Sequence, residues 1–276
     1  MIFDITHPDV QRAVDVALAE DVRSGDITTE ASIPADLQAE ARFVAREDLT
    51  LAGVELLELL YTNPVLKMCS GRRALAGDEI ALVRGPARQL LTRERVSLNC
   101  LQRLSGIATL AARFVEAVAG TDVRILDTRK TTPGLRVLEK MAAAAGGVLN
   151  HRMGLWDAVL IKNNHIRLAG GVRAAVERCR PLGKPVEVEV RTRSEIIEAL
   201  SCGANRLLLD NMTPLAAAAE IRFIAKRAEV EISGGVTLAN VRAYAETGAD
   251  YVSCGAITHS ARAVDINLRL EPEWVP

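Results

Sequence analysis

Residues 185–211, PVEVEVRTRSEIIEALSCGANRLLLDN, carry a strand, a helix and the next strand, and this unit decides the predicted fold. Its two apolar runs, 185–190 and 206–211, are rich in valine and leucine, as is typical of strands in a parallel sheet. Between them, Thr192 and Glu195 form a capping-box pattern, which predicts the start of a helix. The stretch is therefore one βα unit followed by the strand of the next.

Four other runs repeat this pattern, and their ends lie roughly 20 to 35 residues apart, enough for one strand and a returning helix. They are VRILDTRK (123–130), AVLIKNNH (158–165), EVEISGG (229–235) and DYVSCGA (250–256). Six strands rather than eight predict an α/β protein with an incomplete (β/α) barrel. In such barrels the functional groups lie at the carboxyl ends of the strands.

The N-terminal part has a different pattern. QAEARFVAR (38–46) alternates apolar and polar residues and GDEIALVRG (77–85) is similar, so both predict antiparallel strands. The residues after Pro86 have helical spacing, with Gly106 as a break and Gly120 as a stop. We expect an N-terminal α+β open-sandwich domain with a linker helix over 1–110. A (β/α) barrel domain would cover 111–276, its last residues returning to the N-terminal domain.

Composition excludes several classes of protein. The net charge is −1, so any anion binding must come from local clusters of Arg and Lys. Aromatic residues are only 3% of the chain, which argues against stacking on nucleic acid. The five cysteines form no C-x-x-C pair, which argues against disulfides and zinc and favours the cytoplasm. Neither a signal peptide nor an apolar run of membrane-spanning length is visible, so no membrane partner is expected.

Positive residues follow the first two barrel strands. Arg129 and Lys130 end the first run, where solvated surface charges are an equal alternative. Lys162 follows the apolar run AVLI, so its stem begins where a barrel interior opens. His151 and Arg152 lie in the glycine-bordered loop between these strands, and the adjacent Arg favours an anion site.

Acidic and small residues follow the later strands. Glu187 and Glu189 alternate with valines, so both point to the same side of the strand. With Asp210 at the end of the next strand they predict a site for Mg²⁺ and substrate phosphates, and the alternative is an internal ion pair with Lys162. Ser233-Gly234-Gly235 and Cys254-Gly255-Ala256 predict a phosphate cradle.

Specific motifs then resemble one family over nearly the whole chain, in order. They are EDVRSGDITTE (20–30), LLTRERVSLNCLQRLSGIAT (90–109), DTRKTTPGLRVLEK (127–140), NHRMGL (150–155), LIKNNHI (160–166), VEVEV (186–190), LLLDNM (207–212), ISGGV (232–236) and GAITHS (255–260). The family is the quinolinate phosphoribosyltransferases, also called nicotinate-nucleotide pyrophosphorylases (carboxylating).

This resemblance implies a fold and a set of site residues. The fold is an N-terminal α/β domain and an incomplete barrel, assembled as a homodimer or higher homo-oligomer that shares sites between subunits. The Mg²⁺ cofactor would be held by Glu189 and Asp210, directly or through water. The implied substrate-binding residues are Arg95 of a neighbouring subunit, Thr128, Arg129, Lys130, His151, Arg152, Lys162, Glu189, Asp210, Ser233, Gly234 and Gly255.

The resemblance also implies a reaction. Phosphoribosyl passes from phosphoribosyl pyrophosphate to the nitrogen of quinolinate, and CO₂ is lost, giving nicotinate mononucleotide and pyrophosphate for NAD biosynthesis. Glu189 and Asp210 would act electrostatically, because breaking the glycosidic bond needs no proton transfer. Lys130 or Lys162 would protonate the ring carbon after CO₂ leaves.

Some positions depart from the family's pattern, which keeps alternatives open. Asn163 stands where the family has Asp, and Met141-Ala142-Ala143-Ala144 replaces an aromatic and basic segment. A diverged paralogue that acts on or senses a related pyridine carboxylate is one alternative. A barrel aldolase with Lys162 as Schiff-base nucleophile is the other.

Overall fold

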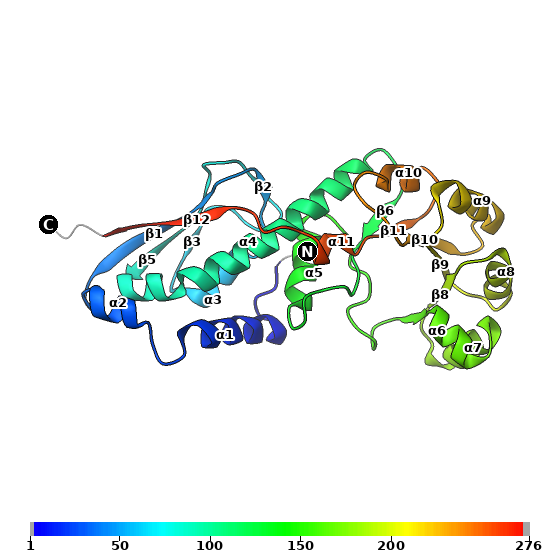
Figure 1. Ribbon diagram of the computed structural model, residues 1–276, viewed down its shortest axis with the longest axis horizontal. Helices are drawn as coiled ribbons and strands as arrows, with labels where there is room; N and C mark the ends of the chain where they lie inside the picture. The colour runs from blue at the N-terminus through cyan, green and yellow to red at the C-terminus, as the bar shows by residue number, and fades with distance from the viewer. Residues whose placement is uncertain (1–2, 273–276) are drawn as a thin grey trace. The chain divides into compact units, whose positions relative to one another are not determined.

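The computed structural model describes residues 3–272, which divide into two compact units (Figure 1). The first unit contains the described residues up to 112, residues 131–147, and those from 257 onward. The second contains residues 113–130 and 148–256. Among residues 3–272, every helix is too short or too polar to be a membrane-spanning segment.

An antiparallel sheet organises the first unit. Its strand order is β12-β1-β5-β3, and β1 pairs antiparallel with both β12 and β5. The alternation in β1 buries Ala39, Ala41, Phe43 and Ala45, which confirms the predicted half-buried strand. The strands are β1 (Gln38–Ala45), β3 (Val65–Leu66), β5 (Glu79–Pro86) and β12 (Ile266–Pro272), with a separate pair β2 (Leu49–Thr50) and β4 (Arg73–Ala74).

A single long helix, α4 (Ala87–Ala117), follows the last strand of this N-terminal segment. The predicted break at Gly106 is wrong, because the helix continues through it. A Cβ on Gly106 would lie 2.0 Å from the carbonyl oxygen of Arg262, so this glycine permits a close backbone approach. The helix ends shortly before Gly120, whose φ of 79° is left-handed.

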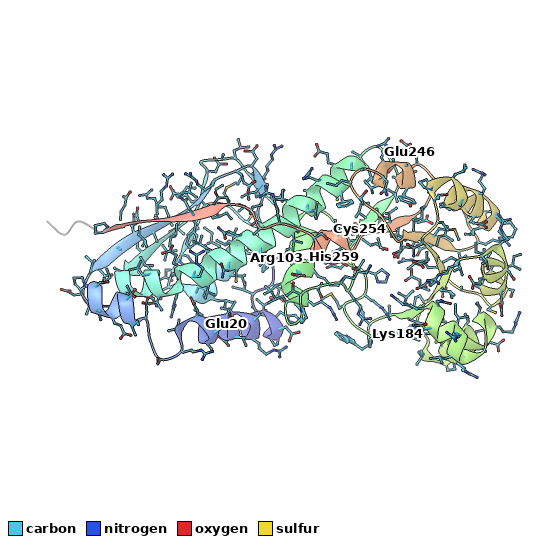
Figure 2. The ribbon with its side chains drawn as sticks, in the orientation of Figure 1. Glu20, Arg103, Lys184, Glu246, Cys254 and His259 are labelled. Carbon is cyan, nitrogen blue, oxygen red and sulfur yellow. The ribbon has the colours of Figure 1, made fainter. Side chains whose placement is uncertain are left out.

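An ion pair between a partly buried arginine and a buried glutamate fastens α4 within the first unit. Arg103, labelled in Figure 2, donates to Glu139 Oε1 at 2.8 Å and to the carbonyl oxygen of Thr258. Glu139 is fully buried and also accepts hydrogen bonds from the amide and hydroxyl of Thr132. The remaining helices are α1 (Pro8–Val22), α2 (Ile27–Ser32), η1 (Val54–Leu56), α3 (Leu57–Leu60), α5 (Arg136–Ala145) and α11 (Ala256–His259), whose first residue belongs to the second unit.

Six parallel strands form the sheet of the second unit, in the order β6-β11-β10-β9-β8-β7. Each of the six predicted runs contains one of them. The outer strands β6 and β7 do not pair with each other, so the barrel is incomplete, as predicted. The strands are β6 (Arg124–Leu126), β7 (Val159–Ile161), β8 (Val186–Val190), β9 (Arg206–Asp210), β10 (Glu229–Ser233) and β11 (Tyr251–Ser253).

Short helices alternate with these strands, as Figure 1 shows. The predicted capping box is confirmed, because Thr192 caps α8 and Glu195 returns a hydrogen bond to the backbone. Thr213 caps α9, which begins at Pro214. The helices are α6 (Asn163–Ala169), α7 (Val172–Cys179), η2 (Arg180–Leu182), α8 (Arg193–Ser201), α9 (Pro214–Ile224) and α10 (Val241–Ala245).

We predict that Gly106→Ala lowers the free energy of unfolding by about 3 kcal/mol, because a methyl group cannot fit against a backbone carbonyl. Gly120→Ala is the matched control, since nothing lies within 4 Å of its Cβ position. Its cost should be limited to about 1–2 kcal/mol of left-handed strain. Urea unfolding measures both, and equal losses would mean that the close approach is unimportant.

Candidate functional site

The register of the parallel sheet brings acidic side chains to one face. Glu187 pairs with Arg206 and Glu189 with Leu208, while Glu231 pairs with Leu208 from the other side. Aligned residues of neighbouring strands point the same way, and so do alternate residues along a strand. The predicted inward positions of Glu187 and Glu189 therefore share a face with Asp210, Glu231 and Ser233.

A buried aspartate fastens the loop that carries His151. Asp127 is fully buried at the end of β6, and Oδ1 accepts the His151 amide at 2.8 Å. Its Oδ2 accepts the side-chain amide of Asn150 at 2.7 Å. Sequence reasoning did not select Asp127, although a carboxylate directly after a buried strand was an available signal. Residues 127–130 and 149–152 thus lie side by side, as the bridge between Leu126 and Leu149 requires.

His151 connects this loop to two buried carboxylates. Its Nε2 lies 3.3 Å from Glu187 Oε2 and 3.4 Å from Glu231 Oε2. Its Nδ1 accepts a hydrogen bond from the Arg152 amide at 2.8 Å. Burial acts to lower the pKa of His151, but the contacts with both glutamates raise it above its ordinary value. The three groups are therefore electrostatically linked.

The protons of this cluster can be placed from the contacts. A raised pKa favours a second proton on the imidazole, but that proton would have to displace the Arg152 amide from Nδ1. With this contact in place, the imidazole carries one proton, on Nε2. Burial raises the pKa of the Glu187 carboxyl. At Glu231 burial also acts to raise the pKa, but the contact with His151 lowers it overall.

Two arginines come together beside this cluster. Arg152 Nη1 donates to the carbonyl oxygen of Ala158 at 2.9 Å, which fixes the guanidinium. Burial lowers the pKa of Arg152, and the positive charge of Arg129 lowers it further, whereas the charge of Glu187 acts in the opposite direction. The arginines are thus close enough to repel each other, and a bound anion would relieve that repulsion.

The two predicted lysines are exposed. Lys130 follows Arg129, and its amide donates to Thr128 Oγ1 at 3.1 Å. Among residues 3–272, no carboxylate lies within ion-pair distance of Lys162, so the alternative pairing with Glu187 or Glu189 is not formed. An exposed Lys162 also lacks the desolvation that activates a Schiff-base nucleophile.

Glu189 and Asp210 share one cationic partner, Arg191. The guanidinium lies 3.2 Å from Glu189 Oε1 and 2.8 Å from Asp210 Oδ2. These carboxylates are the predicted Mg²⁺ ligands, and in this structure the guanidinium of Arg191 pairs with both. Sequence reasoning missed Arg191. Its position directly after VEVEV was visible, but its two partners depend on the sheet register.

The predicted phosphate cradle has a tight backbone. Gly234 has a φ of 95°, and its Cβ would lie 2.2 Å from Asn211 Oδ1, so only glycine fits. The Asn211 amide donates to the Ser233 carbonyl at 2.9 Å. Gly255 is the residue directly before α11 (Ala256–His259). The Ser233-Gly234 and Gly255 turns therefore follow adjacent strands, β10 and β11.

Arg95 lies on α4 in the first unit and is exposed.

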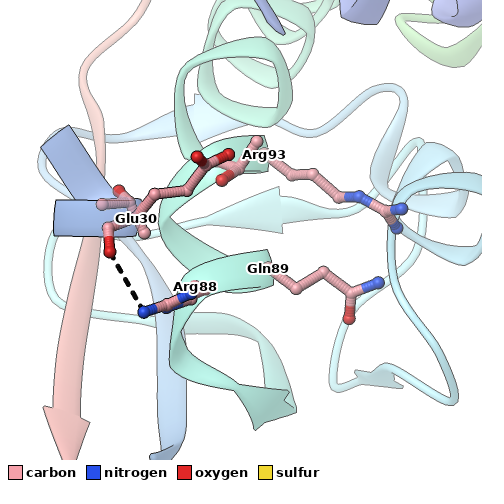
Figure 3. Close-up of a pocket in the computed structure, with 6 residues that line it drawn as sticks. Glu30, Arg88, Gln89 and Arg93 are labelled. Atoms are coloured by element: carbon pink, nitrogen blue, oxygen red, sulfur yellow. Dashed lines mark hydrogen bonds between the residues drawn. The ribbon is translucent and has the colours of Figure 1, made fainter. Parts of the chain in front are cut away.

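A pocket of about 580 Å³ in the same unit lies between α2 and the start of α4 (Figure 3). Its Arg88 donates to the carbonyl oxygens of Ile33 and Glu30. Arg93 donates to that of Leu60, so both arginines hold backbone segments together.

Comparisons with known proteins identify the family. The chain matches two family models, the quinolinate phosphoribosyl transferase N-terminal domain over residues 26–105 and the C-terminal domain over residues 107–269. The crystal structure of NadC from Streptococcus pyogenes is similar, with a TM-score of 0.92 and 37% identity, over 98% of this chain and 99% of that chain.

Curated relatives cover almost the full length. The chain is 40% identical to quinolinate phosphoribosyltransferase [decarboxylating] 1b of Nicotiana tabacum, over 97% of this chain and 84% of the relative. It is 37% identical to the probable nicotinate-nucleotide pyrophosphorylase [carboxylating] of Bacillus subtilis, over 96% of this chain and 94% of the relative. With the fold that its motifs predict and family matches over nearly its whole length, the chain belongs to the quinolinate phosphoribosyltransferase family.

Proposed function

We propose that this protein transfers phosphoribosyl from phosphoribosyl pyrophosphate to quinolinate with loss of CO₂, giving nicotinate mononucleotide and pyrophosphate for NAD biosynthesis. The observation that carries the proposal is that Arg129 and Arg152 lie close together beside His151, on neighbouring loops. Quinolinate has two carboxylates, and guanidinium groups bind carboxylates through paired charged hydrogen bonds. The site is thus matched to a small dianion.

Mg²⁺ is the cofactor that we propose, and Glu189 and Asp210 are the residues that would hold it. Mg²⁺ usually takes only one or two protein carboxylates and keeps water and substrate phosphates as its other ligands. Arg191 now neutralises these carboxylates, which supports their affinity for a cation. When bound, the ion would offset the negative charge that develops on the departing pyrophosphate.

The other residues have distinct proposed roles. Ser233, Gly234 and Gly255 would surround the 5-phosphate, because backbone amides at such turns bind phosphate oxygens. Thr128 would line the dicarboxylate pocket with His151. After CO₂ leaves, the ring carbon needs a proton, and the exposed ammonium groups of Lys130 and Lys162 are the candidate donors.

We further propose a homodimer or higher homo-oligomer, with Arg95 of one subunit completing the pocket of another. Exposed Leu155 and Trp156, near the β7 edge of the open sheet, support an assembly, because apolar surface of this kind is often covered by a partner. The cytoplasm is the proposed compartment, since all five cysteines are free.

The reaction itself is tested by product release. We expect equal amounts of pyrophosphate and CO₂ from quinolinate, and no CO₂ from nicotinate, which lacks the carboxylate that is lost. Arg152→Ala should raise the KM for quinolinate more than tenfold, because a charged contact contributes about 1.5–3 kcal/mol. The control Arg173→Ala, an exposed arginine of α7, should leave it unchanged. Binding of quinolinate without turnover would instead indicate a sensor.

Arg191→Gln should strengthen Mg²⁺ binding roughly two- to fivefold, because an exposed ion pair competes only weakly with the metal. Calorimetry with MgCl₂ in the absence of substrates measures this directly. Arg193→Gln is the matched control, since Arg193 pairs with Glu220 instead and should not alter the affinity. Weaker Mg²⁺ binding by the Arg191 variant would count against Glu189 and Asp210 as the ligands.

Shared sites are tested by mixing inactive subunits. Arg95→Ala and Lys162→Ala proteins should each lose activity, while mixed assemblies should regain part of it. In a mixed dimer, one of the two sites receives both an intact Arg95 and an intact Lys162, provided that each site uses two chains. Mixed assemblies of verified composition that remain inactive would contradict the shared site.

A further inference from the structure

The interior of the second unit's sheet carries negative charge where a parallel barrel normally carries branched apolar side chains. Glu231 on β10 is fully buried, and Glu187 on β8 is 7% exposed. Within residues 3–272, neither carboxylate oxygen of Glu231 has a hydrogen-bond partner at normal distance. The nitrogens that face it are His151 Nε2 at 3.4 Å and Arg206 Nη1 at 3.8 Å.

Burying a carboxylate is costly, so its retention calls for a compensating contact. Arg206 is already paired with Glu229 at 2.8 Å, which leaves His151 as the closer partner of Glu231. The Ser253 hydroxyl also faces Glu231 and lowers the pKa of its carboxyl, though less than His151 does. The contact with His151 is therefore the main stabilising one.

The imidazole of His151 connects the buried carboxylates to the backbone of Arg152. One ring nitrogen faces the buried carboxylates, and the other, Nδ1, accepts the Arg152 amide at 2.8 Å. Asp127 holds the His151 amide from the other side. The backbone that positions Arg152 is consequently fixed at two points, one of which depends on the imidazole remaining in this orientation.

We propose that Glu231, together with Glu187, is a positioning residue: the buried carboxylates hold the Nε2 proton of His151, so that Nδ1 fixes the Arg152 backbone for dicarboxylate binding. The inference rests on the proposed function and deepens it. Glu187 also lies close enough to act electrostatically on Arg152, opposite in sign to Arg129, which offsets part of the repulsion between the arginines while no substrate is bound.

The tautomer of His151 provides a test that needs no catalysis. The chain has four histidines, so ¹⁵N-histidine spectra can be assigned with one His151→Asn variant. We expect His151 to show a protonated Nε2 and an unprotonated Nδ1 in the wild-type protein. A protonated Nδ1 at neutral pH would overturn the proposal. So would a stoichiometric metal ion in purified protein bound through Nε2, because His151, Glu187 and Glu231 also have the spacing of metal ligands.

Kinetics separate positioning from general stability. Glu231→Gln keeps the shape of the side chain but removes its charge, and it should raise the KM for quinolinate roughly tenfold, the loss of one charged contact. The kcat and the KM for phosphoribosyl pyrophosphate should stay within twofold. Glu229→Gln is the matched control two residues away on the same face, half-exposed and paired with Arg206, and it should alter none of these values.

Two outcomes distinguish this inference from the function on which it rests. If the wild-type protein neither binds nor converts quinolinate, the proposed function fails, whereas the tautomer is still measurable. If quinolinate is converted but Glu231→Gln leaves its KM unchanged, or lowers kcat alone, the positioning role is wrong. Should Glu231→Gln not fold, the wild-type tautomer decides, and Glu187→Gln supplies the second variant for the KM.

Discussion

Repulsion between like charges is the constraint on which this site depends. In the proposed function two guanidinium groups share one small dianion, so they must lie near each other before the dianion arrives, and burial makes their repulsion stronger. Arg129 and Arg152 are held in this way by loops fastened through Asp127 and His151. The buried charge of Glu187 acts on Arg152 in the opposite direction and makes the arrangement tolerable.

One face of the sheet in the second unit is therefore polar where an apolar core would be usual. Leu207 and Leu209 of β9 point to the helices and are fully buried, whereas the opposite face of the sheet gathers Glu187, Asp210 and Glu231. Such groups require partners, and each finds one across neighbouring strands or loops. A similar solution occurs in the first unit, where Arg103 and Glu139 pair inside the fold.

Sequence patterns predicted most of the backbone. All six barrel strands, the capping box at Thr192 and the alternation of β1 were legible because period and capping are local properties. Gly106 was misinterpreted as a helix break for the same reason. The local sequence indicates only that glycine is flexible. In the structure Gly106 is needed because the backbone of Arg262, which is remote in the sequence, packs directly against it.

The sequence by itself determined which residue types stand at the ends of the strands, and hence that cations, carboxylates and glycine turns would meet at one edge. Only the tertiary structure decided their pairing: His151 with Glu187 and Glu231, and Arg191 with Glu189 and Asp210. Pairing depends on the register between strands and on distances of a few ångström between remote segments. Local propensity carries no information about either, because both arise only when remote strands assemble into the sheet.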